Sequence, residues 1–141
     1  MATADKIRLL IADDNAAYRC ALVGILSTYP TLEVVGEATN GEDAILRSEE
    51  LRPAIVLMDI NMPKLDGIGA TRHIKAHDKE VKVIGLSVHS DQYHKDAMID
   101  AGATELLPKE NATHDLYGAI QRAVAPRHNP SASSSSWGLP G

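Results

Sequence analysis

The sequence contains a single cysteine, Cys20, no phenylalanine, and only 4% aromatic residues. One cysteine cannot form an internal disulfide, and it suits a reducing cytoplasm. The N-terminal residues MATADKIRLL contain neither an apolar signal core nor a run of membrane-spanning length. We therefore expect a cytoplasmic protein without export signal or membrane span, and a core built from aliphatic side chains.

An excess of basic residues is also lacking, because the net charge is −5. This charge argues against a nucleic-acid-binding surface in this part of the chain, although not against a basic partner domain. Hydrophobic residues make up 44% and charged residues 23%, as is ordinary for globular proteins. A length of 141 residues favours one domain.

Short apolar runs alternate with amphipathic stretches along the chain. The apolar runs predict five strands, at 7–12, 32–37, 54–58, 81–86 and 105–107. The amphipathic stretches predict four helices, at 16–26, 40–51, 66–74 and 90–101, and a fifth helix that Thr113 caps. Strands that are apolar nearly throughout are typical of a parallel sheet covered on both faces. The predicted fold is therefore α/β, a doubly wound (βα)5 domain with the flavodoxin-like strand order 2-1-3-4-5.

Finer predictions concern individual side chains. Helical spacing places Tyr18, Tyr93 and Val124 on the inward faces of their helices. Asn40 and Asp43 form an approximate capping box at the start of the second helix.

From residue 126 the sequence PRHNPSASSSSWGLPG is rich in proline, serine and glycine. We expect a folded domain over 1–125 and a flexible linker or tail over 126–141.

Polar residues stand where the predicted strands end. The first strand leads into Asp13 and Asp14, and the third, within IVLMDINMPKLDG, leads into Asp59. The fourth leads into Ser87, and the fifth leads to Lys109. In an open parallel sheet of this order, ligands bind beyond the carboxyl ends of the strands, between strands 1 and 3. These side chains should therefore meet at one edge.

Such a group of side chains suits phosphoryl chemistry. Three carboxylates a few ångströms apart repel one another, so one should hold a proton or a cation should join them. Their hard oxygens favour Mg²⁺, whereas a lone cysteine and scattered histidines disfavour Zn²⁺. A carboxylate is a nucleophile toward phosphoryl groups, and a metal, a lysine and a hydroxyl stabilise the charge that develops. Each residue alone has an ordinary structural role, such as a cap or a turn, but their joint placement favours a site.

Over residues 6–125 the sequence resembles the receiver domains of two-component response regulators. The matching stretches are IADD at 11–14, LMDINMPKLDG at 57–67, LSVH at 86–89, AGA at 101–103, and Lys109. The stretch SVHSDQYH at 87–94 and the two leucines before Pro108 resemble the NarL/LuxR-type subfamily. The resemblance implies that Asp59 accepts a phosphoryl group from a sensor histidine kinase.

The resemblance also implies the surrounding ligands. Asp13 and Asp14 would bind Mg²⁺ together with Asp59 and the backbone carbonyl of Asn61. Lys109 would pair with the phosphoryl group.

By the same resemblance, Ser87 would be the switch hydroxyl. Three positions depart from the family pattern: Leu106 replaces a usual aromatic residue, Glu110 a common proline, and Val88 a smaller residue. Without the aromatic ring, the signal is expected to pass through backbone movement and aliphatic repacking.

NarL/LuxR-type regulators normally carry a C-terminal helix-turn-helix domain. The implied function is therefore control of transcription, with DNA bound only through an output domain missing from this chain. The alternative is a stand-alone single-domain regulator. A homodimer through helix 4, strand 5 and helix 5, or through helices 1 and 5, is a further expectation.

Two other function classes fit less well. A Mg²⁺-dependent phosphohydrolase of the haloacid-dehalogenase kind needs a second acid two residues after its nucleophile, where Asn61 stands here. In a flavin-binding module, Asp13 and Asp14 would repel the FMN phosphate. The expected role is a signalling switch and not an enzyme.

Overall fold

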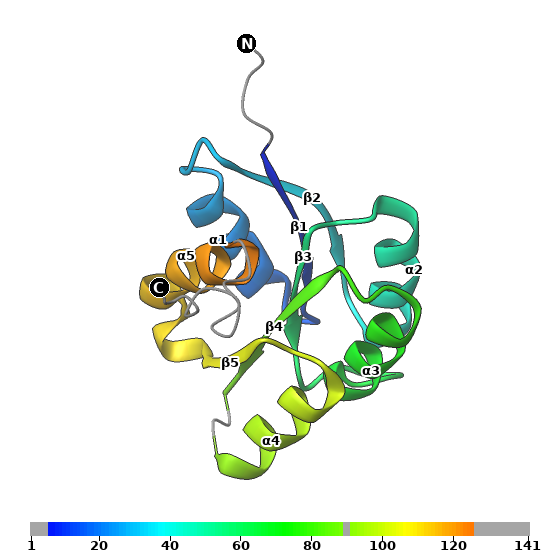
Figure 1. Ribbon diagram of the computed structural model, residues 1–141. Coiled ribbons are helices and arrows are strands. Elements are labelled where there is room, and N and C mark those ends of the chain that lie inside the picture. The colour runs from blue at the N-terminus through cyan, green and yellow to red at the C-terminus, as the bar shows by residue number, and fades with distance from the viewer. Residues whose placement is uncertain (1–5, 89–90, 126–141) are drawn as a thin grey trace, which may run out of the picture.

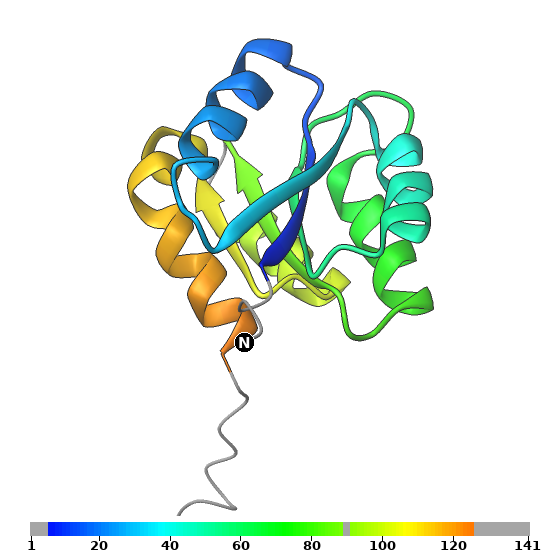
Figure 2. The ribbon, with the colours of Figure 1, turned by 90° about the horizontal axis from the view of Figure 1, so that it is seen from above.

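The computed structural model describes residues 6–88 and 91–125, so the predicted linker at 126–141 lies outside the described residues. Five parallel strands form one sheet in the order β2-β1-β3-β4-β5. Helices α1 and α5 cover one face, and α2, α3 and α4 cover the other (Figures 1 and 2). The predicted doubly wound fold and its strand order are confirmed.

The strands and helices alternate along the chain. The strands are β1 (Ile7–Ala12), β2 (Leu32–Ala38), β3 (Ile55–Asp59), β4 (Lys82–Ser87) and β5 (Glu105–Pro108). The helices are α1 (Ala16–Leu26), α2 (Gly41–Leu51), α3 (Gly67–His77), α4 (Gln92–Ala101) and α5 (Ala112–Val124), and a 3-10 turn, η1 (Lys109–Asn111), precedes α5.

The core has two layers because successive strand residues point to opposite faces of the sheet. Leu10 and Val56 belong to the cluster under α2, α3 and α4. Leu9 and Leu57 belong to the cluster under α1 and α5. Every residue of β3 is buried. This burial explains why β3 is an unbroken apolar run up to Asp59.

Side-chain caps start four of the helices. The side chains of Asn15, Asn40, Asp66 and Asp91 each accept a hydrogen bond from the N–H three residues on, at 2.8–2.9 Å. The predicted capping box closes differently, since the Asp43 carboxylate accepts from the N–H of Thr39, at 3.4 Å.

The predicted cap of the last helix is wrong. Helix α5 begins at Ala112, not after Thr113, because η1 runs directly into it without a side-chain cap. Two inward-facing predictions are wrong as well. Tyr93 is 75% exposed in the first turn of α4, ahead of the buried Met98. Val124, 36% exposed, is the last residue of α5 and lies beyond the buried part of that helix.

One glycine fixes how α3 begins beside the end of β3. The N–H of Gly67 donates to the carbonyl of Ile60 at 2.8 Å. A Cβ at position 67 would lie 2.1 Å from the carbonyl oxygen of Asp59. Only glycine therefore lets the loop after Asp59 return this closely to the strand.

Candidate functional site

Three carboxylates meet at the carboxyl ends of β1 and β3, which are hydrogen-bonded neighbours. Asp13 and Asp14 directly follow β1, and Asp59 is the last residue of β3. Each offers one carboxylate oxygen, and these oxygens all lie within 4.8 Å of one another. Asp13 is fully buried and Asp59 is 3% exposed, whereas Asp14 is exposed. The predicted convergence of the acids is therefore present.

Lys109 reaches this cluster from the end of β5. Its Nζ lies 2.6 Å from Oδ2 of Asp13 and 3.4 Å from Oδ1 of Asp59. Only 14% of the lysine side chain is exposed. Three carboxylates against one ammonium leave the site negatively charged.

Ser87 lies on the same edge of the sheet. It is fully buried, and it pairs in register with Pro108 of β5. The residue before it, Leu86, pairs with Asp59 of β3. Ser87 is thus held between the strand that carries the acid and the strand that leads to Lys109.

The loop after β3 contributes a backbone donor. Asn61 is exposed, and its N–H donates to Oδ1 of Asp59 at 3.3 Å. This contact places the Asn61 peptide beside the acids, while metal ligation by its carbonyl stays a prediction.

Burial sets the electrostatics of Asp59. Desolvation, and next the negative charge of Asp13, raise the pKa of Asp59 to about 6, although Lys109 and the Asn61 N–H oppose the shift. In the metal-free protein, Asp59 therefore titrates close to neutral pH.

Two residues of α1 that sequence reasoning left without a site role also support the cluster. Arg19 donates from Nη1 to the carbonyl of Asp13 at 2.6 Å, and from Nε to Glu37 at 2.9 Å. The ring of Tyr18 lies under Lys109, with Nζ 4.5 Å from the ring centroid. Burial, and next the charges of Asp13 and Asp59, raise the pKa of Tyr18 to about 12, so its phenol stays neutral.

The donor set fits a hard divalent cation. All side-chain ligands available here are carboxylate oxygens, which Mg²⁺ prefers. Within 6–88 and 91–125, no second group of three His, Cys, Asp or Glu side chains could hold a metal ion.

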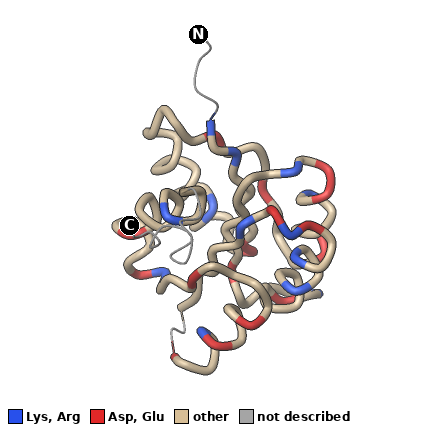
Figure 3. The backbone as a smooth tube through the Cα atoms, in the orientation of Figure 1, with Lys and Arg blue, Asp and Glu red and all other residues tan. Residues whose placement is uncertain are grey.

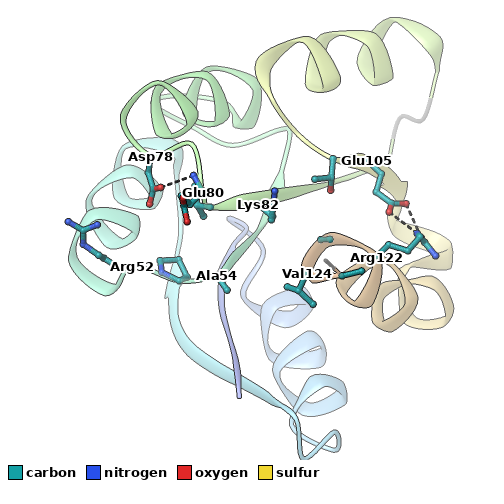
Figure 4. Close-up of a pocket in the computed structure, with 13 residues that line it drawn as sticks. Arg52, Ala54, Asp78, Glu80, Lys82, Glu105, Arg122 and Val124 are labelled. Atoms are coloured by element: carbon teal, nitrogen blue, oxygen red, sulfur yellow. Dashed lines mark hydrogen bonds and ion pairs between the residues drawn. The ribbon is translucent and has the colours of Figure 1, made fainter. Parts of the chain in front are cut away.

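A hollow of about 850 Å³ at the opposite end of the sheet is a different feature. Figure 4 shows it between the starts of β4 and β5 and the end of α5, with Arg122 paired to Glu105 at 3.0 Å. None of the predicted site residues lines it.

Basic and acidic residues are interspersed along the chain (Figure 3). No helix among the described residues is both long enough and apolar enough to cross a bilayer.

The fold and the acidic edge together define a receiver domain. The family model "Response regulator receiver domain" matches residues 9–121, and the chain belongs to this family. Its relatives include regulators of the NarL/LuxR type, and this receiver domain is of that type. Receiver domains bind Mg²⁺ at an acidic pocket, which corresponds to the cluster found here.

Two curated relatives illustrate the similarity. The chain is 37% identical over 117 residues to the transcriptional regulatory protein DegU of Brevibacillus brevis, covering 83% of this chain and 50% of DegU. It is 33% identical over 119 residues to the response regulator GacA of Pseudomonas protegens, covering 84% of this chain and 56% of GacA. The chain thus spans about half the length of these relatives.

Solved structures agree with this assignment. The receiver domain of a NarL-type regulator from Mycobacterium tuberculosis superposes with a TM-score of 0.83 at 25% identity, covering 88% of this chain and all of that one. A LuxR-family response regulator from Aurantimonas sp. SI85-9A1 gives a TM-score of 0.82 at 28% identity, covering 88% and 89% of the two chains.

Proposed function

We propose that this chain is a phosphorylation-controlled switch in which Asp59 accepts a phosphoryl group from a sensor histidine kinase. The observation that carries the proposal is the meeting of Asp13, Asp14 and Asp59 within 4.8 Å, with Lys109 contacting two of them. A carboxylate, a lysine and a hard-metal site are the groups that phosphoryl transfer to an acid requires.

The contacts of each carboxylate favour Asp59 over Asp13 as the nucleophile. Asp13 accepts a hydrogen bond on Oδ1 from the N–H of Asn15 at 2.8 Å and one on Oδ2 from Lys109 at 2.6 Å. Asp59 has longer contacts, 3.3 Å to the Asn61 N–H and 3.4 Å to Lys109, and both involve Oδ1. No hydrogen bond from the described residues reaches Oδ2 of Asp59, so this oxygen is available to attack phosphorus.

The transfer itself requires one bond to form and one to break. Oδ2 of Asp59 forms the new P–O bond while the P–N bond of the kinase phosphohistidine breaks. The leaving imidazole keeps the electron pair and takes up a proton. Because the phosphoryl group adds a charge of about −1.5 to −2, Lys109 is drawn from Asp13 toward the new oxygens.

Asp13, Asp14 and Asp59 are the residues that would hold Mg²⁺, with the backbone carbonyl of Asn61. Bound Mg²⁺ would neutralise part of the acidic cluster and of the phosphoryl oxygens. The exposure of Asp14 suits a metal that keeps several of its waters.

Ser87 is the proposed switch hydroxyl. Donation from its hydroxyl to a phosphoryl oxygen would displace the end of β4 and, through the Ser87–Pro108 pairing, the neighbouring β5. Residues 89 and 90 of the following loop lie outside the described residues. Leu106 of β5 is a buried aliphatic residue, so this displacement would pass through backbone movement and aliphatic repacking.

The proposed output is control of transcription through a helix-turn-helix domain. DegU, which this chain matches over half its length, is named a transcriptional regulatory protein. A protein-glutamate methylesterase of Methanosarcina mazei also matches, over 31% of its own length. The proposed role of this domain is nevertheless a switch and not an enzyme. Its proposed location is the cytoplasm, which suits the exposed free thiol of Cys20.

A homodimer is the proposed response to phosphorylation, through α4, β5 and α5 or through α1 and α5. On α4, the exposed Tyr93 and Ile99, 75% and 49% accessible, offer apolar surface for such a contact. Light-scattering mass with and without a small phosphodonor tests this, and Ile99→Glu should block only a dimer that uses α4.

The function is tested by incubation with acetyl phosphate and Mg²⁺, followed by intact mass. The wild type should gain one phosphoryl group, and chelation of Mg²⁺ should suppress the gain. Asp59→Asn should gain none. The control is Asp66→Asn, which should behave as wild type. Asp66 is an exposed carboxylate in the loop after β3, and asparagine can replace it as the cap of α3. Undiminished labelling of Asp59→Asn would contradict the proposal.

A further inference from the structure

Tyr18 contacts both ends of Lys109. Its ring lies under the ammonium, with Nζ 4.5 Å from the centroid, and its hydroxyl lies 3.4 Å from the Lys109 carbonyl oxygen. An ammonium is attracted to the negative face of an aromatic ring at this distance. The hydroxyl contact is long, so the ring carries most of the interaction.

These contacts belong to a closed circuit of side-chain and backbone contacts. Asp13 Oδ1 accepts from the N–H of Asn15, and Asn15 Oδ1 accepts from the N–H of Tyr18. Tyr18 contacts Lys109, and Lys109 returns to Oδ2 of Asp13 at 2.6 Å. The start of α1 is thereby connected to η1 through the ammonium that faces Asp59.

The ammonium of Lys109 lies near two carboxylates. Lys109 is the first residue of η1, and the carboxylates that attract it belong to Asp13, just after β1, and to Asp59, at the end of β3. Nothing in a flexible four-carbon side chain selects between them. The face of the Tyr18 ring beneath the ammonium adds an attraction at a fixed place beside both carboxylates.

We propose that Tyr18 is a positioning residue of the phosphoryl switch, which holds Lys109 beside Asp13 and directs its ammonium to the phosphoryl group on Asp59. This inference rests on the proposed function. In this proposal α1, as well as β5, is connected directly to Lys109, the side chain that moves toward the phosphoryl group.

Three variants of Tyr18 distinguish the contribution of the charge on the ring face from the contributions of the hydroxyl and of the ring's volume. Tyr18→Phe keeps the ring, Tyr18→Leu removes it, and pentafluorophenylalanine at position 18 keeps its shape while reversing the charge of its face. Tyr29→Leu is the matched control, because Tyr29 also packs against the α1/α5 core but stacks on Tyr117, at 4.2 Å.

The first measurement is the second-order rate constant for phosphorylation by acetyl phosphate at saturating Mg²⁺. We expect a loss of ~3- to 10-fold in Tyr18→Leu and in the fluorinated variant, from the usual strength of a cation–π contact. Tyr18→Phe and Tyr29→Leu should stay within about twofold of wild type. Because the fluorinated ring fills the same space, it keeps the test valid if Tyr18→Leu folds poorly.

The second measurement is the NMR shift of the Lys109 ε-methylene protons without phosphodonor. The ring face should move these protons upfield in wild type and Tyr18→Phe, and the shift should vanish in Tyr18→Leu.

Two results would overturn the inference: a wild-type rate in the fluorinated variant, or an equal loss of rate in Tyr29→Leu. If wild type itself accepts no phosphoryl group, the proposed function fails, while the methylene shift still reports whether Tyr18 holds Lys109.

Discussion

Replacing Asp59 with asparagine should stabilise the metal-free protein at neutral pH. Burial and the charge of Asp13 raise the pKa of Asp59 from 3.8 to about 6. Between these two pKa values, Asp59 of the folded protein keeps a proton that the unfolded chain has already released. The free energy of unfolding therefore falls as the pH rises from about 3.8 to about 6. A difference of about two pKa units corresponds to ~3 kcal/mol, which is lost in full above about pH 7.

Asparagine avoids this loss because it is neutral at every pH and has nearly the same shape. It can still accept the hydrogen bond of the Asn61 N–H, and Lys109 keeps its 2.6 Å contact with Asp13. The free energy of unfolding should therefore be ~2–3 kcal/mol higher in Asp59→Asn at about pH 8, and nearly unchanged at about pH 4.

Urea denaturation with a chelator present, at a series of pH values, measures this difference. Asp66→Asn serves as the control, because Asp66 is exposed and caps α3 through one bond to the N–H of Gly69. A difference that does not depend on pH, or an Asp59→Asn protein that is less stable than wild type at pH 8, would refute the reasoning.

Further predictions concern the metal, the hydroxyl and the loop. Mg²⁺ at about ten times its Kd should raise the free energy of unfolding by ~1.4 kcal/mol, and Asp14→Asn should lose most of this gain in thermal melts. Ser87→Ala should still gain a phosphoryl group but lose the phosphodonor-dependent amide shifts of Leu106; full wild-type shifts would exclude the hydroxyl as relay. Gly67→Ala should cost ~1–3 kcal/mol in denaturant titrations, since its Cβ meets the carbonyl of Asp59 at 2.1 Å.

Much of this fold could be predicted because its local signals agree with one another. The run Ile55–Asp59 is apolar and ends on an acid, which identified both a buried strand and its functional end. The caps at Asn40 and Asp66 were visible as short polar residues before amphipathic stretches. Five strands alternating with helices suit the order 2-1-3-4-5, and in that order the strand ends bring the acids and Lys109 together.

The features that sequence reasoning missed depend on tertiary packing. Thr113 is a residue type that often caps helices, and no sequence pattern predicts the 3-10 turn that precedes α5. Tyr93 has the right spacing for an inward residue, but it lies in a first turn that is not covered by the core. Tyr18 was predicted only as an inward residue, because its partner Lys109 lies 91 residues further along the chain.

The identity of the reacting side chain is tested most directly by borohydride reduction of the phosphorylated protein. An aspartyl phosphate is an acyl phosphate, and its reduction leaves homoserine at the position that carried the phosphoryl group. Tandem mass spectrometry of the digested protein should find homoserine at position 59 and aspartate at positions 13 and 14. Homoserine at 13 or 14, with aspartate intact at 59, would contradict the account.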